Sequence, residues 1–135
     1  AFFGLTLDAT GAHLARAALE ATAYQTRDLL QAMVGDGCAE PAAIRVDGGM
    51  TAISWLCQSL ADIVEVPVDR PANLETTALG AAFHAGLATG VWSGLDELAR
   101  TWSAANTFRL KMDGKLRQTL LEGWEKAVAK TLGRP

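Results

Sequence analysis

A strand pattern that ends in two glycines is the segment of this sequence best suited to chemistry. Residues 44–52 read Ile-Arg-Val-Asp-Gly-Gly-Met-Thr-Ala, and a helical pattern follows directly. Such a junction exposes backbone N–H groups at a helix N-terminus, where the helix dipole favours an anion or a polar ligand. Gly48 and Gly49 have no side chain that would hold a ligand away from the backbone. The alternative is a tight strand-to-helix turn without a ligand, which the same residues allow.

Other residues with chemical potential form weaker patterns. His13 and His84 are far apart in the sequence and have no Cys or carboxylate at ligand spacing, so we expect no zinc site and assign His13 to the first turn of its helix. Asp47 could act as a general base, but an acidic residue at a strand end more often hydrogen-bonds the turn or its neighbours. No combination of Ser, His and acid indicates a hydrolase.

The elements that would position this segment alternate between strand and helix patterns. Strands are predicted at residues 2–7, 43–47 and 64–69, the last as an edge strand because it contains Pro67, paired in parallel with the strand at 43–47. Helices are predicted at residues 11–34, 51–63, 76–89, 95–102 and 113–131. This alternation favours an α/β layered fold, with few strands and packed helices.

The helical spacing also predicts which faces are buried. For the first helix the predicted face is Leu14, Ala18, Ala21, Leu29 and Ala32. For the last helix it is Leu116, Leu120, Trp124 and Ala127. In the third helix, residues 80–82 are Gly-Ala-Ala, which would let another backbone or a ligand approach closely.

Composition excludes several classes of partner. The chain has 135 residues, the length of one domain, and a net charge of −3, which gives no support to nucleic acid or an anionic membrane as partners. No apolar run is long enough to span a bilayer, and the first residues do not resemble a signal peptide. With only Cys38 and Cys57, we expect a cytoplasmic protein in which these cysteines form no disulfide.

Several short motifs occur in a characteristic order along the chain. They are Gly4-Leu5-Thr6, Thr10 with His13, residues 16–20, residues 24–28, the Asp47-Gly48-Gly49 strand end, Arg70-Pro71 and the Glu-Thr-Thr-Ala-Leu-Gly-Ala-Ala run at 75–82. In this order they resemble the C-terminal signature of the FGGY carbohydrate kinases. The resemblance is strong over about residues 1–102 and looser over the last helix.

The resemblance implies an actin-like, ribonuclease-H-like ATPase fold in which two domains close on a nucleotide. Residues 1–135 would then be the C-terminal portion of the nucleotide-facing domain of a longer chain. Gly48 and Gly49 would line the adenine and ribose, with Met50 and Ile53 beside them, and residues 76–88 would form a connecting helix at the hinge between domains. Ile53 stands where similar members usually carry an Asn that contacts the nucleotide.

The same resemblance implies ATP with Mg²⁺ as the cofactor and phosphoryl transfer to the terminal hydroxyl of glycerol. The catalytic Asp, the phosphate-binding loops, the magnesium ligands and the substrate contacts all belong to the part of such kinases that precedes this segment. We therefore assign no catalytic residue and no metal ligand here, and we expect the chain alone to be inactive. The expected partners are ATP or ADP, a preceding N-terminal domain, a small polyol or sugar bound elsewhere, and a second copy of the chain.

Two alternatives remain open at this point. The substrate could be another sugar of the family, such as xylulose or gluconate. The chain could also be a non-catalytic interaction or scaffold module of the same fold, which Ile53 favours because its side chain offers no hydrogen bond.

Overall fold

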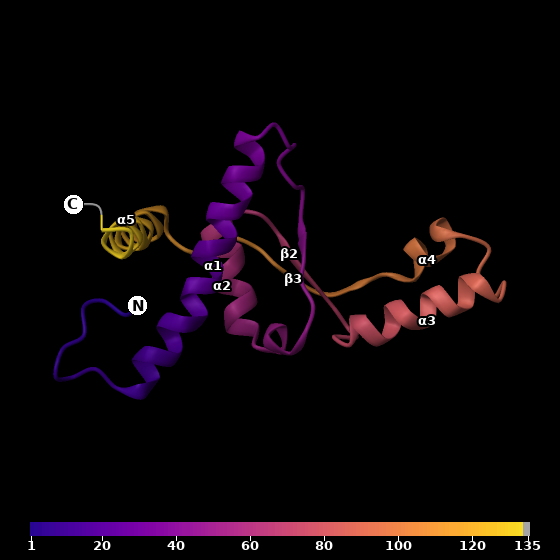
Figure 1. Ribbon diagram of the computed structural model, residues 1–135, viewed down its shortest axis with the longest axis horizontal. Helices are drawn as coiled ribbons and strands as arrows, with labels where there is room; N and C mark the ends of the chain where they lie inside the picture. The colour runs from indigo at the N-terminus through magenta and orange to yellow at the C-terminus, as the bar shows by residue number, and fades with distance from the viewer. Residues whose placement is uncertain (134–135) are drawn as a thin grey trace.

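The computed structural model describes residues 1–133 as helices arranged around a three-stranded sheet (Figure 1). In chain order the elements are α1 (Gly11–Gly35), β1 (Ile44–Arg45), the 3₁₀ turn η1 (Gly49–Ala52), α2 (Ser54–Val64), β2 (Val68–Pro71), α3 (Thr76–Ala88), α4 (Leu95–Thr101), β3 (Ala104–Phe108) and α5 (Gly114–Thr131). The α/β class predicted from the sequence is confirmed, and all five predicted helices form within a few residues of their expected bounds.

The sheet has the strand order β1-β2-β3. β1 and β2 are parallel, as predicted, and Ile44 lies opposite Val68. The expected edge position of the Pro67 strand is wrong, because β2 lies in the middle and pairs with β3 on its other side. Pro67 is tolerated because it lies just before the strand, where only its carbonyl is used: it accepts a hydrogen bond from the Ile44 N–H at 2.8 Å.

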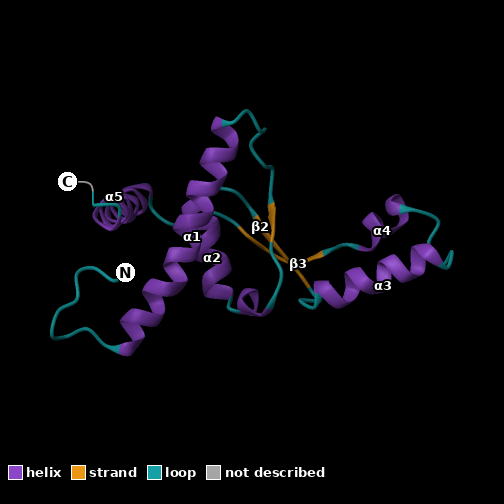
Figure 2. Ribbon diagram, viewed as in Figure 1, coloured by secondary structure: helices purple, strands orange, loops and turns teal. Residues whose placement is uncertain are grey.

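Helix α2 forms the centre of the core. It packs against α1 on one side and against β2 and β3 on the other, so that α1 and the sheet do not share an extensive contact (Figure 2). The buried cluster contains Ala23, Tyr24, Cys57, Leu60, Ala61, Ile63, Val68 and Leu121. α5 covers this cluster. The Trp124 ring stacks on the Tyr24 ring with 5.4 Å between the ring centres, and the Trp124 Nε1 donates a hydrogen bond to the Asp28 carboxylate at 2.7 Å.

Helices α3 and α4 extend away from the sheet as an arm (Figure 1). The segment that connects the two helices packs against α3 at Gly86, where an added Cβ would lie 2.0 Å from the Trp92 ring. Trp92 also meets Phe83 edge to face at 5.2 Å. Beyond it, Glu97 accepts hydrogen bonds from the N–H and the hydroxyl of Ser93, which lower the pKa of this carboxylate. Only Gly86 is buried in α3, so the small residues at 80–82 contact no other element closely.

One predicted strand is absent from the structure, and one observed strand was not predicted. Residues 2–7 form no strand: Gly4 adopts a left-handed φ of 76°, which interrupts an extended run, and Phe2 and Phe3 are exposed. β3 was not predicted, because Ala-Ala-Asn-Thr-Phe has no alternating apolar pattern and its strand is almost entirely exposed. Its hydrogen-bonded partner, β2, stabilises it instead.

The predicted strand at 64–69 begins later than expected. α2 continues through Val64 and ends at Glu65, whose left-handed φ of 60° closes the helix. Glu65 is held there by a 2.7 Å ion pair with Arg117 of α5. β2 therefore starts only at Val68.

The predicted helix faces are partly wrong. α1 buries Ala23 and Tyr24, whereas Leu29 is 61% exposed. In α5 the buried residue is Leu121, and Leu116 is exposed. Periodicity identifies the more apolar face of a helix but does not show how far a neighbouring helix covers it. α1 is far longer than α2, so α2 cannot cover both ends of α1 (Figure 1).

Both cysteines are free, Cys38 on the surface and Cys57 in the core. Within residues 1–133, no helix is long and apolar enough to cross a membrane.

Candidate functional site

The segment that follows β1 forms a sharp turn fixed by glycine. Gly48 has φ 84° and ψ 167°, a conformation that residues with a Cβ rarely adopt. Its N–H donates to the Leu74 carbonyl at 3.3 Å, and its carbonyl accepts from both the N–H and the hydroxyl of Thr51, at 3.0 and 2.7 Å. These bonds fold residues 49–52 into the 3₁₀ turn η1.

This turn corrects the predicted start of the second helix. The sequence predicted a helix from about Thr51, but Ile53 is extended, with φ −79° and ψ 97°, and α2 begins at Ser54. The Thr51 bonds to Gly48 hold the backbone in a tighter turn than an α-helix allows. The favourable end of the α2 dipole therefore lies at Ser54 and not at Gly49.

All four residues predicted to contact a nucleotide lie on or beside this turn. Gly48 is half-buried, Gly49 is exposed, Met50 is 51% exposed and Ile53 is 42% exposed. A Cβ added at Gly48 or Gly49 would meet nothing within 4 Å. The space above the glycines is thus open, and the apolar side chains of Met50 and Ile53 could pack against a flat ring system.

The same turn is joined to the start of helix α3. The Thr76 hydroxyl donates to the Asp47 carboxylate, next to the bond from Gly48 to Leu74. Asp47 thus hydrogen-bonds a neighbouring element, in agreement with the structural role preferred for it over that of a general base. The predicted ligand-binding turn and the predicted hinge helix therefore meet at one point of the structure.

Arg70 on β2 donates hydrogen bonds to the carbonyls of this turn, and the sequence did not suggest this role. Its Nη1 donates to the carbonyls of Thr51 and Ala52, at 2.8 and 3.3 Å, and to the Ser54 hydroxyl at 3.2 Å. Its Nη2 donates to Asn106 of β3 at 2.9 Å. The only signal in the sequence was Arg70 itself, which stands among the family motifs without a stated function.

The Cys57 thiol lies under the same turn. Its Sγ donates to the Thr51 carbonyl at 3.3 Å, so this carbonyl accepts hydrogen bonds from both Arg70 and Cys57. Burial raises the pKa of Cys57, an effect that the nearby Arg70 guanidinium partly offsets. The thiol is therefore protonated at neutral pH and acts as a hydrogen-bond donor.

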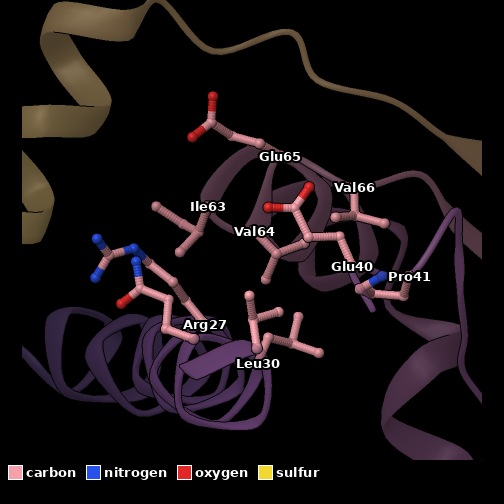
Figure 3. Close-up of a pocket in the computed structure, with 10 residues that line it drawn as sticks. Arg27, Leu30, Glu40, Pro41, Ile63, Val64, Glu65 and Val66 are labelled. Carbon is pink, nitrogen blue, oxygen red and sulfur yellow. The ribbon is translucent and has the colours of Figure 1, made fainter. Parts of the chain in front are cut away.

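A pocket of about 520 Å³ lies elsewhere, between α1 and the segment that connects α2 to β2 (Figure 3). Aliphatic side chains such as Leu30 and Val64 form its walls, and Arg27, Glu40 and Glu65 lie at its rim. None of the residues at 48–53 lines it. Within the described part of the chain there is also no group of three or more His, Cys, Asp or Glu residues that could hold a metal ion.

The segment that contains the glycine turn matches a known class of protein. Residues 1–89 match the family model of the FGGY family of carbohydrate kinases, C-terminal domain. This match covers about two thirds of the chain. The chain therefore belongs to the FGGY family of carbohydrate kinases.

Curated relatives similar to this chain include glycerol kinases. The chain is 50% identical to a glycerol kinase of Gluconobacter oxydans over 96% of its own length and 25% of the relative. It is 53% identical to a glycerol kinase of Rhodospirillum centenum over 95% of its length and 26% of the relative. The chain thus spans about a quarter of the length of the curated relatives it matches.

Solved structures of the same family share this fold. Glycerol kinase of Plasmodium falciparum with ADP superposes with a TM-score of 0.78 at 33% identity, over 96% of this chain and 26% of that one. A xylulose kinase of Rhodospirillum rubrum gives a TM-score of 0.73 at 27% identity, over 98% of this chain and 27% of that one. The predicted actin-like, ribonuclease-H-like fold and the resemblance stated from the motifs are both confirmed.

Proposed function

We propose that this chain is the C-terminal, nucleotide-facing part of an ATP-dependent kinase that phosphorylates glycerol. The observation that carries the proposal is an identity of about 50% with glycerol kinases along nearly the whole chain. The solved relative of similar fold, from Plasmodium falciparum, was crystallised with ADP. In the proposed enzyme the γ-phosphoryl group of ATP is transferred to a terminal hydroxyl of glycerol, which gives glycerol 3-phosphate and ADP.

Gly48 and Gly49 are proposed to line the adenosine part of the nucleotide, with Met50 and Ile53 at its side. The open space above both glycines supports this role, because a ligand can approach the backbone there. Ile53 offers packing but no hydrogen bond. Loss of one neutral hydrogen bond costs about 0.5–1.5 kcal/mol, so we expect the affinity to fall by up to about tenfold compared with relatives that carry a polar residue there.

Phosphoryl transfer itself is assigned to residues outside this chain. The reaction depends on positioning and on neutralisation of phosphate charge by metal ions and basic groups. The described residues near the turn supply neither a metal-ligand cluster nor a glycine-rich loop that carries a lysine. We therefore propose that residues 1–135 are one portion of a longer cytoplasmic enzyme, that an N-terminal domain supplies the Mg²⁺ ligands and the polyol site, and that this chain alone has no kinase activity.

A second candidate is a non-catalytic interaction module that has kept the fold. The exposed, apolar Ile53 beside the turn is the observation that favours it, since this side chain cannot form a hydrogen bond with the polar edge of a base. Xylulose or gluconate as substrate is a weaker alternative within the family, because the curated relatives reported above are glycerol kinases.

Titration of ADP onto the protein at its full native length tests the proposal. The informative variant is Gly49→Val, because a Cβ added at Gly49 meets no protein atom within 4 Å and the backbone there is not left-handed. The fold should survive, while the branched side chain projects into the proposed nucleotide space. We expect the Kd for ADP to rise about tenfold or more, which corresponds to about 1.4 kcal/mol. Gly114→Val, at another open glycine, is the matched control.

Calorimetry or amide chemical shifts near Gly48 would report binding. If saturating ADP gives neither heat nor a shift with the unaltered protein, the scaffold alternative is correct. If ADP binds equally well to the Gly49→Val protein, nucleotide binding lies elsewhere and the assignment of the turn is wrong.

A further inference from the structure

Arg70 connects the glycine turn to the sheet through both ends of its guanidinium group. One nitrogen, Nη1, donates to the carbonyls of Thr51 and Ala52 and to the Ser54 hydroxyl, while Nη2 donates to the Asn106 side chain on β3. The same group lies 5.2 Å from the centre of the Phe108 ring. The guanidinium thus contacts the sheet, the turn and the first residue of α2.

The strand geometry explains why this side chain reaches the turn. Val68 and Arg70 are two residues apart and share one face of β2, and Val68 lies in the core beneath α2. A register shift between Arg70 and Pro71 interrupts the pairing with β3 at this point. Bulges of this kind redirect a side chain at the end of a strand, and here the side chain lies against residues 51–54.

Arginine is required by the geometry of these contacts. The planar guanidinium offers donors in two directions at once, so it can hold backbone carbonyls on one side and an amide oxygen on the other. A lysine ammonium on its flexible stem cannot span both sets of partners. The Thr51 carbonyl, which also accepts from Cys57, is therefore fixed from two directions.

We propose that Arg70 is a positioning residue for nucleotide binding: it fixes the carbonyls of η1, and through them it fixes the height and orientation of Gly48 and Gly49. Arg70 does not need to touch the nucleotide, because its contacts are on the carbonyl side of the turn. The inference rests on the proposed function, since it assigns the turn to the nucleotide. It adds that the affinity of the site depends on a residue of the neighbouring strand.

The test compares Arg70→Gln, Arg70→Lys and Asn106→Ala in the protein at its full native length, with Arg16→Gln as the matched control. Arg16 is an exposed arginine of α1 in a pair with Glu20. We expect Arg70→Gln to raise the KM for ATP and the Kd for ADP by about five- to tenfold, because hydrogen bonds to a charged donor are lost. The KM for the polyol and kcat should change less than twofold. Arg70→Lys and Asn106→Ala should give intermediate values.

A merely structural role would have a different signature. If Arg70 only stabilised the fold, kcat would fall with the folded fraction and both KM values would stay the same, which would overturn the inference. Hydrogen exchange of the amides at 49–53 in the nucleotide-free protein gives a readout that does not depend on the ligand, and it should accelerate in Arg70→Gln and Asn106→Ala. Unchanged exchange in both variants would also overturn it.

The outcomes separate this inference from the proposed function. If Gly49→Val and Arg70→Gln both leave ADP binding unchanged, the nucleotide assignment is wrong. If Gly49→Val weakens ADP binding and Arg70→Gln does not, only the positioning role is wrong. If Arg70→Gln does not fold, nucleotide binding and hydrogen exchange at residues 49–53 are measured in Arg70→Lys and Asn106→Ala. Those two measurements then support or overturn the positioning role.

Discussion

Asp62 holds the segment before the last helix through a buried carboxylate. Its side chain is only 7% exposed, and its Oδ1 accepts hydrogen bonds from the backbone N–H groups of Lys111 and Met112, at 2.7 and 3.1 Å. The same oxygen accepts from Gln58 one turn earlier, at 3.0 Å, and Gln58 also donates to the Arg109 carbonyl at 2.7 Å. Two side chains of α2 therefore fix the segment that joins β3 to α5.

Replacement of this carboxylate should be costly. We expect Asp62→Ala to lower the free energy of unfolding by about 2–3 kcal/mol, because two backbone donors lose a charged acceptor in a partly buried place. Asp62→Asn keeps an oxygen in position and should cost less. Urea denaturation followed by fluorescence measures both, and a loss below about 0.5 kcal/mol in the alanine variant would contradict this account, since that is the usual effect of a surface change.

The arm formed by α3 and α4 buries few of its residues, Gly86 in α3 and Leu98 in α4. Its internal contact is the Trp92 ring, which lies against the bare backbone at Gly86 and against Phe83. It is joined to the sheet at the start of α3, through Asp47 and Thr76, and just after α4, where the Arg45 guanidinium of β1 lies 3.7 Å from the centre of the Trp102 ring. An element that buries so few residues can open locally while the core stays folded.

Two glycine substitutions in α3 should therefore have opposite effects. Gly86→Ala places a Cβ 2.0 Å from the Trp92 ring and should displace it, at a cost of about 1–3 kcal/mol within the arm. Gly80→Ala, whose Cβ meets nothing within 4 Å, should stabilise the helix by up to about 1 kcal/mol. Hydrogen exchange over residues 76–101 measures both effects. Slower exchange in the Gly86 variant than in the Gly80 variant would show that the Trp92 contact does not hold the arm together.

The helices were predictable from the sequence, as was the edge strand β1, but the other edge strand, β3, was not. Helical spacing and glycine stops are local signals, so α1, α3, α4 and α5 could be placed from neighbouring residues alone. β3 lacks a local signal because its strand is polar, exposed and stabilised by β2. The position of Pro67 was misjudged for the same reason: a central place for β2 depends on a strand that follows more than thirty residues later.

The same division applies to the candidate site. The glycines were identified because their type and position are unusual at a strand end. The role of Arg70 depends on carbonyls of residues 51 and 52 and on Asn106, which no spacing rule brings together. The turn itself was predicted as a helix start, because the two bonds from Thr51 to the Gly48 carbonyl involve a conformation of Gly48 that the sequence permits but does not specify.

The molecule as a whole exposes more surface than a compact protein of its mass. Its accessible surface is 9,187 Å², whereas a folded monomer of 14.3 kDa is expected to expose about 6,800 Å². Large apolar side chains are exposed among the first residues, at Phe2, Phe3, Leu5 and Leu7, and on the arm, at Val91 and Leu95. Surface of this kind favours association with another protein surface.

We therefore expect the 135-residue chain on its own to form dimers or larger oligomers as its concentration rises. Sedimentation over a range from micromolar to millimolar concentration measures this. Leu5→Glu together with Leu7→Glu should weaken the association without loss of helicity, because both side chains are exposed and make no buried contact. A chain that stays monomeric at millimolar concentration would mean that the exposed apolar residues do not form an interface.

The contact between Trp124 and Asp28 also has a consequence for the order of events during synthesis. The two residues are 96 positions apart, and Leu121, beside Trp124 in the same helix, completes the core. At about 5–20 residues per second, a ribosome needs roughly 5–20 s to make the chain between them. During that time Tyr24 lacks the partners that α5 provides in the folded chain, and transiently exposed apolar surface of this kind favours aggregation. A premature stop codon before residue 121 would therefore leave the nascent protein a target for chaperones and proteases, although most of its helices had been made.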